Sequence, residues 1–391
     1  MTPFDLLWLL LPVAAGSGWL VGRFGPRARA SQGGDDDLRS NYFKGINYLL
    51  NEQPDKAIEA FIKVLEVDSE TVETHLALGN LYRRRGEVDR AIRIHQNLIA
   101  RPGLVENQRA EAVLELGQDY LSAGLLDRAE NLLKELADDG IYRVQALRQL
   151  IDIYEQEKDW ERAIECAREL RKATGNQLGP VIAHYHCERA ERFRHKNDAE
   201  AALGSVKEAL EAHQGCVRAS LLEGDIHTDL GEYESAVEAY KRVEEQDADY
   251  VPEIIGRMRY CFRALDRGDE MDTYLTRLME RYGWITPMLA LAELKRERHG
   301  TATAIEFMSE QLKHRSSVRG LDRLLQLELQ ENGNGHTQHV TMLKSLTSDL
   351  LADRPVYKCS HCGFPGKLLH WQCPSCKHWN TIKPIQGVEG E

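Results

Sequence analysis

The chain has 391 residues, 42% of them hydrophobic and 29% charged, with only 12 prolines, so we expect most of it to be folded. Its formal net charge of −12 argues against a general nucleic-acid-binding protein, because phosphate contacts need a basic face. Eight cysteines in a chain of this length do not form a secreted disulfide scaffold, which favours a reducing compartment.

The N-terminal part of the chain contains an uncharged stretch of 17 residues, from Leu6 to Gly22. At 1.5 Å per residue, a helix of this length reaches roughly 25 Å, close to the lower limit for crossing a bilayer. Trp8 and Trp19 lie near its two ends, where interfacial aromatic residues are enriched. We therefore predict a transmembrane helix within residues 1–22.

The charges that flank this stretch favour an uncleaved anchor over a cleaved signal peptide. The leader contains Asp5 and no basic residue, whereas a signal peptide begins with positive charge. Basic residues follow the stretch instead, as Arg23, Arg27 and Arg29. The positive-inside rule then places the bulk of the chain on the cytoplasmic side of the membrane.

Residues 23–38 connect the predicted anchor to the rest of the chain. This segment begins with basic residues and continues as SQGGDDD at positions 31–37, which is small, polar and acidic. Such a composition predicts a flexible linker.

Residues 39–352 have strong helical periodicity and almost no strand signal. A pattern with offsets of 3, 12 and 16 residues begins with Gly45, Tyr48, Ala57 and Phe61. Later copies of this pattern start at Gly79, Gly117, Ile151, Ala190 and Gly224. Consecutive starts lie 34, 38, 34, 39 and 34 residues apart, which matches the 34-residue period of the tetratricopeptide repeat, a helical hairpin.

The residue types in the pattern suit such a hairpin. A small first residue lets the first helix approach the second closely, and the aromatic residue three positions later fills the gap on the same face. The turns at 84–90 and 229–235 carry a glycine just before the second helix, where a left-handed conformation ends a helix. One hairpin cannot bury its apolar face alone, so we expect a stacked solenoid whose groove, lined mainly by first helices, binds peptides or partner proteins.

Beyond residue 250 the repeat pattern weakens while helical periodicity continues. Further hairpins are predicted at Pro252–Arg281 and Thr286–His314, followed by a helical pair at Val318–Glu331 and Gln338–Ala352. The predicted fold is therefore an all-α solenoid of about nine hairpins over residues 39–352.

Several cysteines and a histidine lie within the predicted helices. Lone thiols in helices are usually small buried hydrophobic groups, which we expect of Cys166, Cys187, Cys216 and Cys261. His184 and Cys187 lie three residues apart on one helical turn, but no third metal ligand is visible, so we predict ordinary helical surface there.

The C-terminal segment, residues 355–385, contains a specific metal-binding pattern. Cys359 and Cys362 form one C-x2-C pair, and Cys373 and Cys376 form a second pair after ten intervening residues. Two residues between thiols let both sulfurs turn onto one ion, and two such knuckles complete a tetrahedral thiolate site with no open position. We predict a structural site for one zinc ion, which supplies folding energy to a segment too short to hold a core unaided.

Two alternatives concern this site. Iron stays open as the bound metal, because tetrahedral sulfur sites suit iron as well. His361, His370 and His378 could act as substitute ligands, although four cysteines suffice and we expect these histidines to lie outside the ligand set. We also expect the apolar side chains of Phe364, Leu368–Leu369, Trp371 and Trp379 to dock against the end of the helical array.

Enzymatic motifs are missing from the sequence. There is no GxxxxGK[ST], no HExxH and no glycine fingerprint between a strand and a helix. The glycines at positions 333 and 335 lie in a polar loop without the context of a phosphate cradle. We predict no catalytic residue and no enzymatic activity.

The order of these segments resembles a known family. A short N-terminal anchor, repeats that open with NYFKGINYLLNEQPDKAIEAF and a tail that reads YKCSHCGF…WQCPSCKHW resemble the lipopolysaccharide assembly protein B family of Gram-negative bacteria over the whole chain. The resemblance implies a single-pass inner-membrane protein that faces the cytoplasm, with a rubredoxin-like metal domain. By this resemblance, the membrane anchor of the family corresponds to Leu6–Gly22, and its metal ligands correspond to Cys359, Cys362, Cys373 and Cys376.

The resemblance also implies partners. The family implies a regulatory adaptor that works with the membrane AAA protease FtsH to promote turnover of the UDP-acyl-N-acetylglucosamine deacetylase of lipid A synthesis. It further implies an inner-membrane anti-adaptor partner and a link to lipopolysaccharide assembly and export proteins. The alternatives are a scaffold that gathers lipopolysaccharide enzymes without controlling proteolysis, an iron-based redox carrier and a zinc-ribbon nucleic-acid binder. The sequence also leaves open whether the chain forms a homo-oligomer.

Overall fold

A computed structural model describes residues 32–67, 71–332, 337–388 and 390–391. The chain divides into two compact units, residues 1–153 and residues 154–391, and each is described by itself. The predicted anchor at residues 1–22 lies outside the described residues. Within the described ranges, none of the helices combines the length and hydrophobicity that crossing a membrane requires.

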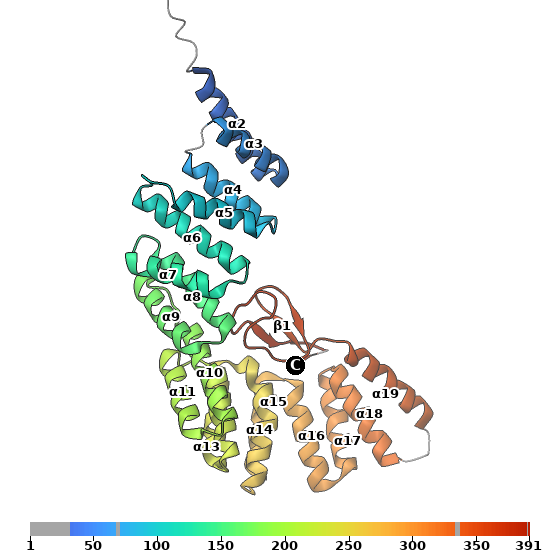
Figure 1. Ribbon diagram of the computed structural model, residues 1–391. Helices are drawn as coiled ribbons and strands as arrows, with labels where there is room; N and C mark the ends of the chain where they lie inside the picture. The colour runs from blue at the N-terminus through green and yellow to red at the C-terminus, as the bar shows by residue number, and fades with distance from the viewer. Residues whose placement is uncertain (1–31, 68–70, 333–336, 389) are drawn as a thin grey trace, which may run out of the picture. The chain divides into compact units, whose positions relative to one another are not determined.

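The first unit consists of stacked helical hairpins (Figure 1). Its helices, together with one that crosses the unit boundary, are α2 (Gln32–Leu50), α3 (Pro54–Val67), α4 (Val72–Arg84), α5 (Val88–Ile99), α6 (Glu106–Ser122), α7 (Leu126–Asp139) and α8 (Arg143–Glu157). The 38-residue interval between the second and third repeats contains the connection between α5 and α6, residues 100–105.

Close packing within the hairpins follows the repeated pattern. A Cβ atom added at Gly45 would lie 2.7 Å from the ring of Phe61, and one at Gly79 would lie 2.3 Å from the ring of His95. The first and last residues of the pattern therefore face each other across the hairpin, which confirms why the first residue is small. Gly86, in the turn between α4 and α5, has the predicted left-handed conformation, with φ of 81°.

A buried polar contact connects the second and third hairpins. His95 and Asp119 are both 0% exposed, and His95 Nδ1 lies 2.5 Å from Asp119 Oδ2. Arg83 donates to the other carboxylate oxygen of Asp119 at 2.7 Å. This contact satisfies a carboxylate that would otherwise be buried without a partner, and the repeat pattern did not reveal it.

The start of α2 differs from the sequence prediction. Residues 32–38, expected as part of a flexible linker, lie in the first two turns of this helix. Extending an existing helix by one residue costs little free energy, whereas nucleating it is costly. The packed part of α2, where Tyr42 and Ile46 contact the cluster around Phe61, therefore allows the helix to continue toward its N-terminus.

The second unit contains the rest of the array. Beyond the end of α8, its helices are α9 (Trp160–Thr174), α10 (Gly179–His195), α11 (Ala199–Ala212), α12 (Val217–Asp229), α13 (Tyr233–Gln246), η1 (Ala248–Tyr250), α14 (Val251–Ala264), α15 (Gly268–Tyr282), α16 (Ile285–His299), α17 (Thr301–His314), α18 (Val318–Asn332) and α19 (Thr337–Ala352). Counting α2 to α19 as pairs, the described residues contain the predicted nine hairpins.

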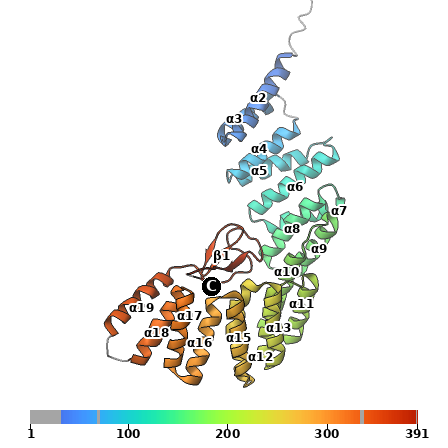
Figure 2. The same ribbon diagram turned by 180° about the vertical axis from the view of Figure 1, so that it is seen from behind.

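A small sheet follows the last helix. Its strands are β1 (Tyr357–Cys359), β2 (Pro365–Gly366) and β3 (Ile382–Pro384), in the order β2-β1-β3 and antiparallel. We refer to residues 355–385 as the metal module. The module lies in the bend of the second unit, with α10 and residues 154–157 of α8 on one side and α14 to α18 on the other (Figures 1 and 2).

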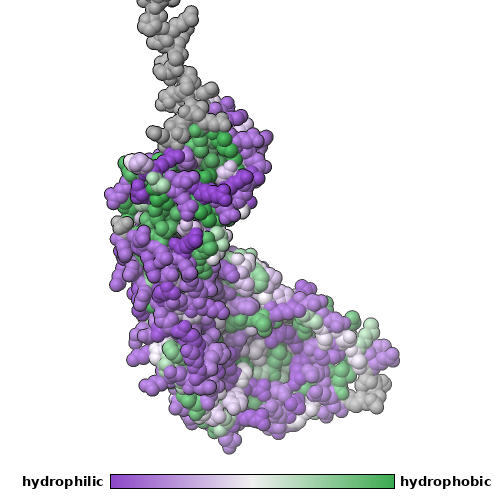
Figure 3. Space-filling view, viewed as in Figure 1, coloured by the Kyte–Doolittle hydropathy of each residue, from purple (hydrophilic) through white to green (hydrophobic). Residues whose placement is uncertain are grey.

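The surface of the second unit is mainly hydrophilic in Figure 3, with smaller hydrophobic areas between the charged side chains. The last helix, α19, carries exposed apolar side chains that include Met342, Leu343, Leu346 and Leu350. In a solenoid each hairpin is covered by the next one, so the outer face of the final helix is not covered by another repeat.

Candidate metal centre and its contacts with the array

The four cysteines that the spacing predicts as metal ligands lie together. The sulfur atoms of Cys359, Cys362, Cys373 and Cys376 are all within 4.8 Å of one another. The Sγ atoms of Cys359 and Cys376 lie 3.8 Å apart, and those of Cys362 and Cys373 lie 3.7 Å apart. Zn–S bonds of about 2.3 Å in a tetrahedron place sulfurs about 3.8 Å apart, so the arrangement fits one tetrahedrally bound ion.

Two similar turns produce this arrangement. In the first knuckle the Gly363 N–H donates to the carbonyl of Cys359 at 2.9 Å, and in the second the Lys377 N–H donates to the carbonyl of Cys373 at 2.9 Å. Gly363 and Lys377 both have positive φ, at 79° and 59°. The left-handed residue after each second cysteine folds the chain back, so that both thiols of a pair point to the same side.

The surroundings of Cys359 favour the thiolate form that a metal requires. Burial by itself raises the pKa of this thiol, but hydrogen bonds with the Thr381 hydroxyl and with the backbone N–H groups of Cys362 and His361 outweigh it. The result lowers the pKa of Cys359, whereas for Cys376 the lowering by the backbone of His378 is outweighed by desolvation and by hydrogen bonds with the neighbouring thiols, which raise the pKa. A deprotonated sulfur is the metal ligand in such sites, so the environment of Cys359 suits the predicted role.

The three histidines of the module differ in position. His361 and His378 are exposed and stack on each other, with ring centroids 3.8 Å apart and an interplanar angle of 20°. Their ligand atoms, together with the sulfur of Cys376, form a second group within 4.8 Å. His370 is exposed and belongs to neither group of ligand atoms among the described residues.

Tryptophan and glutamate side chains attach the module to the array. Trp379 Nε1 donates to Glu155 Oε1 at 3.0 Å, and Gln372 Nε2 donates to Glu155 Oε2 at 3.0 Å. The hydroxyl of Tyr185, on α10, donates to the same carboxylate at 2.6 Å. Hydrogen bonds to a charged acceptor are the strong ones, so Glu155 at the end of α8 is a main attachment point.

Aromatic stacking continues this contact. His184 stacks on Trp379 with centroids 5.1 Å apart at 19°, and Trp371 lies 5.5 Å from the ring of Tyr250. The hydroxyl of Tyr250 donates to the backbone carbonyl of Ile382, in β3, at 2.9 Å. Offset aromatic pairs and a satisfied hydroxyl make this a packed interface.

Ion pairs and the C-terminal residues extend the contact along the array. Lys383 lies 2.9 Å from Asp247 and 2.7 Å from Asp249, and the Tyr357 hydroxyl donates to Glu253 at 2.5 Å. Further along, the side chain of Glu391 accepts hydrogen bonds from α16 and α18, through Thr286 and Arg319. Among these partners, Glu253, Thr286 and Arg319 belong to the first helices of their hairpins, Asp249 belongs to η1, and Asp247 directly precedes η1.

The expected docking place at the end of the array is therefore wrong. The module packs along the face lined by the first helices, from α8 to α14, because Trp371 and Trp379 meet polar and aromatic partners there. Leu368, expected in the docking face, is 70% exposed. The surface prediction for His184 is wrong as well, since this residue is only 3% exposed beneath the module.

Burial gives His184 an unusual pKa. Desolvation lowers this pKa to about 3, and the positive charges of Arg218 and His213 act in the same direction. The imidazole is therefore neutral at physiological pH, as stacking within an apolar contact requires. Neither Glu155 nor His184 carries a motif, and only the tertiary contact reveals their roles.

The buried thiols follow the sequence prediction in three of four positions. Cys187, Cys216 and Cys261 are buried, whereas Cys166 is partly exposed. Cys187 and Cys216 lie next to each other in the buried cluster formed by α10, α11 and α12, with their sulfurs 3.9 Å apart.

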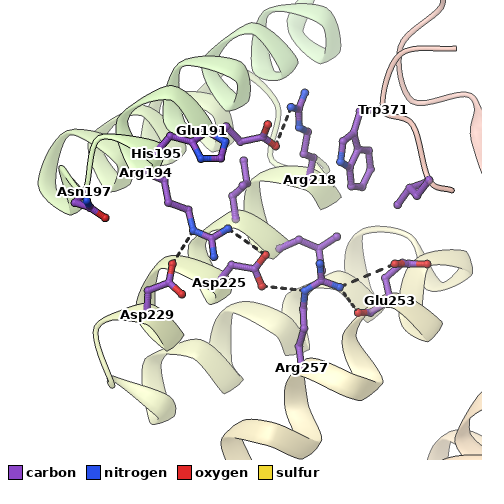
Figure 4. Close-up of a pocket in the computed structure, with 13 residues that line it drawn as sticks. Glu191, Arg194, His195, Asn197, Arg218, Asp225, Asp229, Glu253, Arg257 and Trp371 are labelled. Carbon is purple, nitrogen blue, oxygen red and sulfur yellow. Dashed lines mark hydrogen bonds and ion pairs between the residues drawn. The ribbon is translucent and has the colours of Figure 1, made fainter. Parts of the chain in front are cut away.

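A pocket of about 660 Å³ lies between α10, α12 and α14 and the module residues Leu369 and Trp371 (Figure 4). Its charged side chains form a network in which Asp225 contacts both Arg194 and Arg257. Arg194 contacts Asp229 at 2.7 Å, and Arg257 contacts Asp225 at 2.9 Å. The array and the module thus form one surface that offers both hydrogen-bond donors and acceptors.

Family models match both the metal module and parts of the helical array. A family model described as rubredoxin metal binding domain matches residues 357–384. Tetratricopeptide repeat models match residues 38–71, 74–105, 114–177 and 187–251. Among solved structures, one of MamA protein aligns with a TM-score of 0.36 and 22% identity, over 46% of this chain and 93% of that chain.

Two relatives match over almost their full length. Lipopolysaccharide assembly protein B of Haemophilus influenzae is 34% identical, over 98% of this chain and 99% of the relative. Lipopolysaccharide assembly protein B of Escherichia coli strain K12 is 38% identical, over 99% of both chains. The chain therefore belongs to the lipopolysaccharide assembly protein B family.

Proposed function

We propose that the chain is a non-enzymatic adaptor in the regulation of lipopolysaccharide assembly. In this role it presents the UDP-acyl-N-acetylglucosamine deacetylase to an FtsH-type membrane protease, and an inner-membrane anti-adaptor opposes it. The observation that carries the proposal is the composite surface of the second unit, where the metal module is fixed to the first helices by Glu155, Tyr250 and Trp379. Repeat arrays of this kind bind other proteins through that face.

The four cysteines hold one zinc ion in this proposal. With four thiolates the bound ion has no open coordination position, so it supplies folding stability to the module. Cys359, Cys362, Cys373 and Cys376 then act as structural ligands. Through them, the orientation of Trp371 and Trp379 toward the array depends on the metal.

The segment Leu6–Gly22 acts as a single-pass inner-membrane anchor, with the remainder on the cytoplasmic side. A tether confines the array to the neighbourhood of a membrane-bound protease and raises the effective concentration of a captured partner there. Support for this part comes from the flanking charges of the segment and from family membership.

The pocket beside Trp371 is our candidate for the partner contact. Arg257 and Asp225 expose charged atoms there, next to the apolar side chains of Leu369 and Trp371. An extended peptide presents backbone donors and acceptors together with side chains, and a surface of this mixed character can satisfy both.

The test is the half-life of the deacetylase in cells depleted of the endogenous protein and complemented with variants. Depletion should lengthen the half-life, and the intact chain should restore rapid turnover. Chains that lack residues 1–22 or carry Cys359→Ser should fail to restore it. Arg257→Ala should restore it only in part, whereas the matched control Arg171→Ala, on the second helix α9, should restore it fully.

An unchanged half-life on depletion would contradict the adaptor proposal. Pull-down after crosslinking in membranes separates the alternatives further. Recovery of several lipopolysaccharide enzymes without any change in deacetylase turnover would favour the scaffold instead.

A further inference from the structure

A second group of metal-ligating atoms lies beside the four sulfurs. It consists of His361, Cys376 and His378, whose ligand atoms lie within 4.8 Å of one another. His361 stands between the two cysteines of the first knuckle, and His378 follows the second knuckle by two residues. Both imidazoles are exposed and stack at 3.8 Å, so each knuckle contributes one histidine to the same place on the surface.

A hydrogen bond to the backbone orients the ring of His378. Its Nδ1 atom lies 2.9 Å from the backbone carbonyl of Cys376. A carbonyl oxygen can only accept, so Nδ1 donates this hydrogen bond and Nε2 is the ring nitrogen that remains for an ion. Metal-binding histidines usually hold their second ring nitrogen in this way, by donation to a carbonyl or carboxylate.

The exposure of the four sulfurs shows from which side an ion can arrive. Cys359 and Cys373 are 1% and 0% exposed, whereas Cys362 is exposed and Cys376 is partly exposed. An ion from solvent must therefore first meet the side of Cys362 and Cys376. His361 and His378 lie on that side, because His361 is adjacent to Cys362 and His378 contacts Cys376.

We propose that His361, His378 and Cys376 form a loading site that captures a divalent zinc-type ion and passes it to the four cysteines. This inference rests on the four-thiolate site proposed above. Two nitrogens and one sulfur bound to one zinc lie about 3.3–3.8 Å apart, so the stacked, exposed rings must rotate until their lone pairs meet at the ion.

The transfer is a simple ligand exchange. The two Zn–N bonds and a bond to one water are replaced by three Zn–S bonds, to Cys359, Cys362 and Cys373, and each thiol that binds releases its proton to solvent. Cys376 remains bound throughout, because its sulfur belongs to both groups of ligands. The ion keeps its charge of +2, so no oxidant or reductant takes part.

The experiment measures exchange of bound zinc for radioactive zinc in the loaded full-length protein in detergent. The folded, metal-bound protein is used because the loading route also serves release, by microscopic reversibility. We expect His361→Ala/His378→Ala to bind one zinc per chain and to slow its exchange about tenfold. Mutation of residues that support metal ligands typically lowers metal affinity or activity by about 10–100-fold, and the expected effect is at the lower end of that range. The control His370→Ala removes an exposed histidine of the same module and should exchange at the wild-type rate.

The outcomes separate the two proposals. Wild-type protein that holds neither zinc nor iron would overturn the four-thiolate site itself. Stoichiometric zinc with equal exchange rates in the wild-type protein and the double variant would overturn only the loading site. Slow exchange in His370→Ala to the same extent as in the double variant would also overturn it.

Discussion

The helical array and the metal module of the second unit are stabilised in different ways. The array has large clusters of buried side chains shared between neighbouring hairpins, such as the one around Tyr240, Val243 and Leu275. The buried cluster of the module contains only Cys359, Cys373 and Ile382. The array can therefore fold on local and neighbouring contacts, whereas the module needs both its metal and its contact with the array.

The strongest test of this difference between the array and the module is to remove one metal ligand. Cys373→Ser should release the zinc and unfold the module, because structural zinc contributes on the order of 10 kcal/mol to the folding of such small sites. Zinc content should fall from one ion per chain to none, while the helical circular dichroism signal of the array stays nearly unchanged. Cys261→Ser, which changes a buried thiol of the array, should keep the zinc. Full zinc content in Cys373→Ser would show that the four sulfurs do not share an ion.

Removing the carboxylate that attaches the module tests its dependence on the array. Glu155→Ala leaves Trp379, Gln372 and Tyr185 without their shared acceptor, which should weaken docking by about 2–4 kcal/mol. Limited proteolysis should then cleave the module faster than in the wild-type protein. Glu165→Ala, at an exposed position of α9, is the control and should leave the cleavage rate unchanged. Equal rates in all three proteins would mean that Glu155 does not hold the module.

Close packing within the array can be tested with two glycines of the second unit. A Cβ atom at Gly224 would lie 2.3 Å from the ring of Tyr240, so Gly224→Ala should lower the free energy of unfolding by about 1–3 kcal/mol. At Gly204, within α11, a Cβ atom meets no neighbour within 4 Å. Gly204→Ala should therefore raise the free energy of unfolding by about 0.4–1 kcal/mol. Urea denaturation measures both, and the same sign for the two variants would contradict the packing account.

The buried histidine predicts a pH dependence of the second unit. The pKa of His184 is lowered from 6.5 to about 3, mainly by burial, so below pH 6.5 the unfolded chain binds a proton that the folded chain does not. Stability from this residue is complete above pH 6.5 and is lost as the pH falls toward 3, by about 2 kcal/mol at pH 5.

Replacing His184 separates this contribution from those of other groups. The loss of unfolding free energy between pH 7 and pH 5 should be about 2 kcal/mol smaller in His184→Phe than in the wild-type protein. His339→Phe, at an exposed position, should leave the loss unchanged. An identical loss in His184→Phe and the wild-type protein would show that His184 can be protonated in the folded state.

Sequence periodicity predicted the array well because its contacts are local. The spacing of Gly45 and Phe61 and of Gly224 and Tyr240 encodes neighbours within one hairpin, and these pairs meet as expected. The His95–Asp119 contact was not predicted, because the repeat pattern specifies where side chains point and not which polar groups pair between hairpins.

The sulfur cluster was predictable for a similar reason, since the C-x2-C spacing encodes a local turn. The docking of the module was not, because it depends on contacts between residues more than 100 positions apart, such as Tyr250 with Ile382. No periodic signal marks such a pair. Glu155 and His184 read as ordinary helical residues until the module covers them.

Hydrogen–deuterium exchange with and without zinc tests the central claim most directly, namely that the metal holds the module on the first helices of the second unit. With zinc bound, amide groups of residues 371–382 should be protected. Removal of zinc by a chelator should abolish this protection while the amides of α3 to α5 keep theirs. Unchanged protection of residues 371–382 after zinc removal would contradict the account.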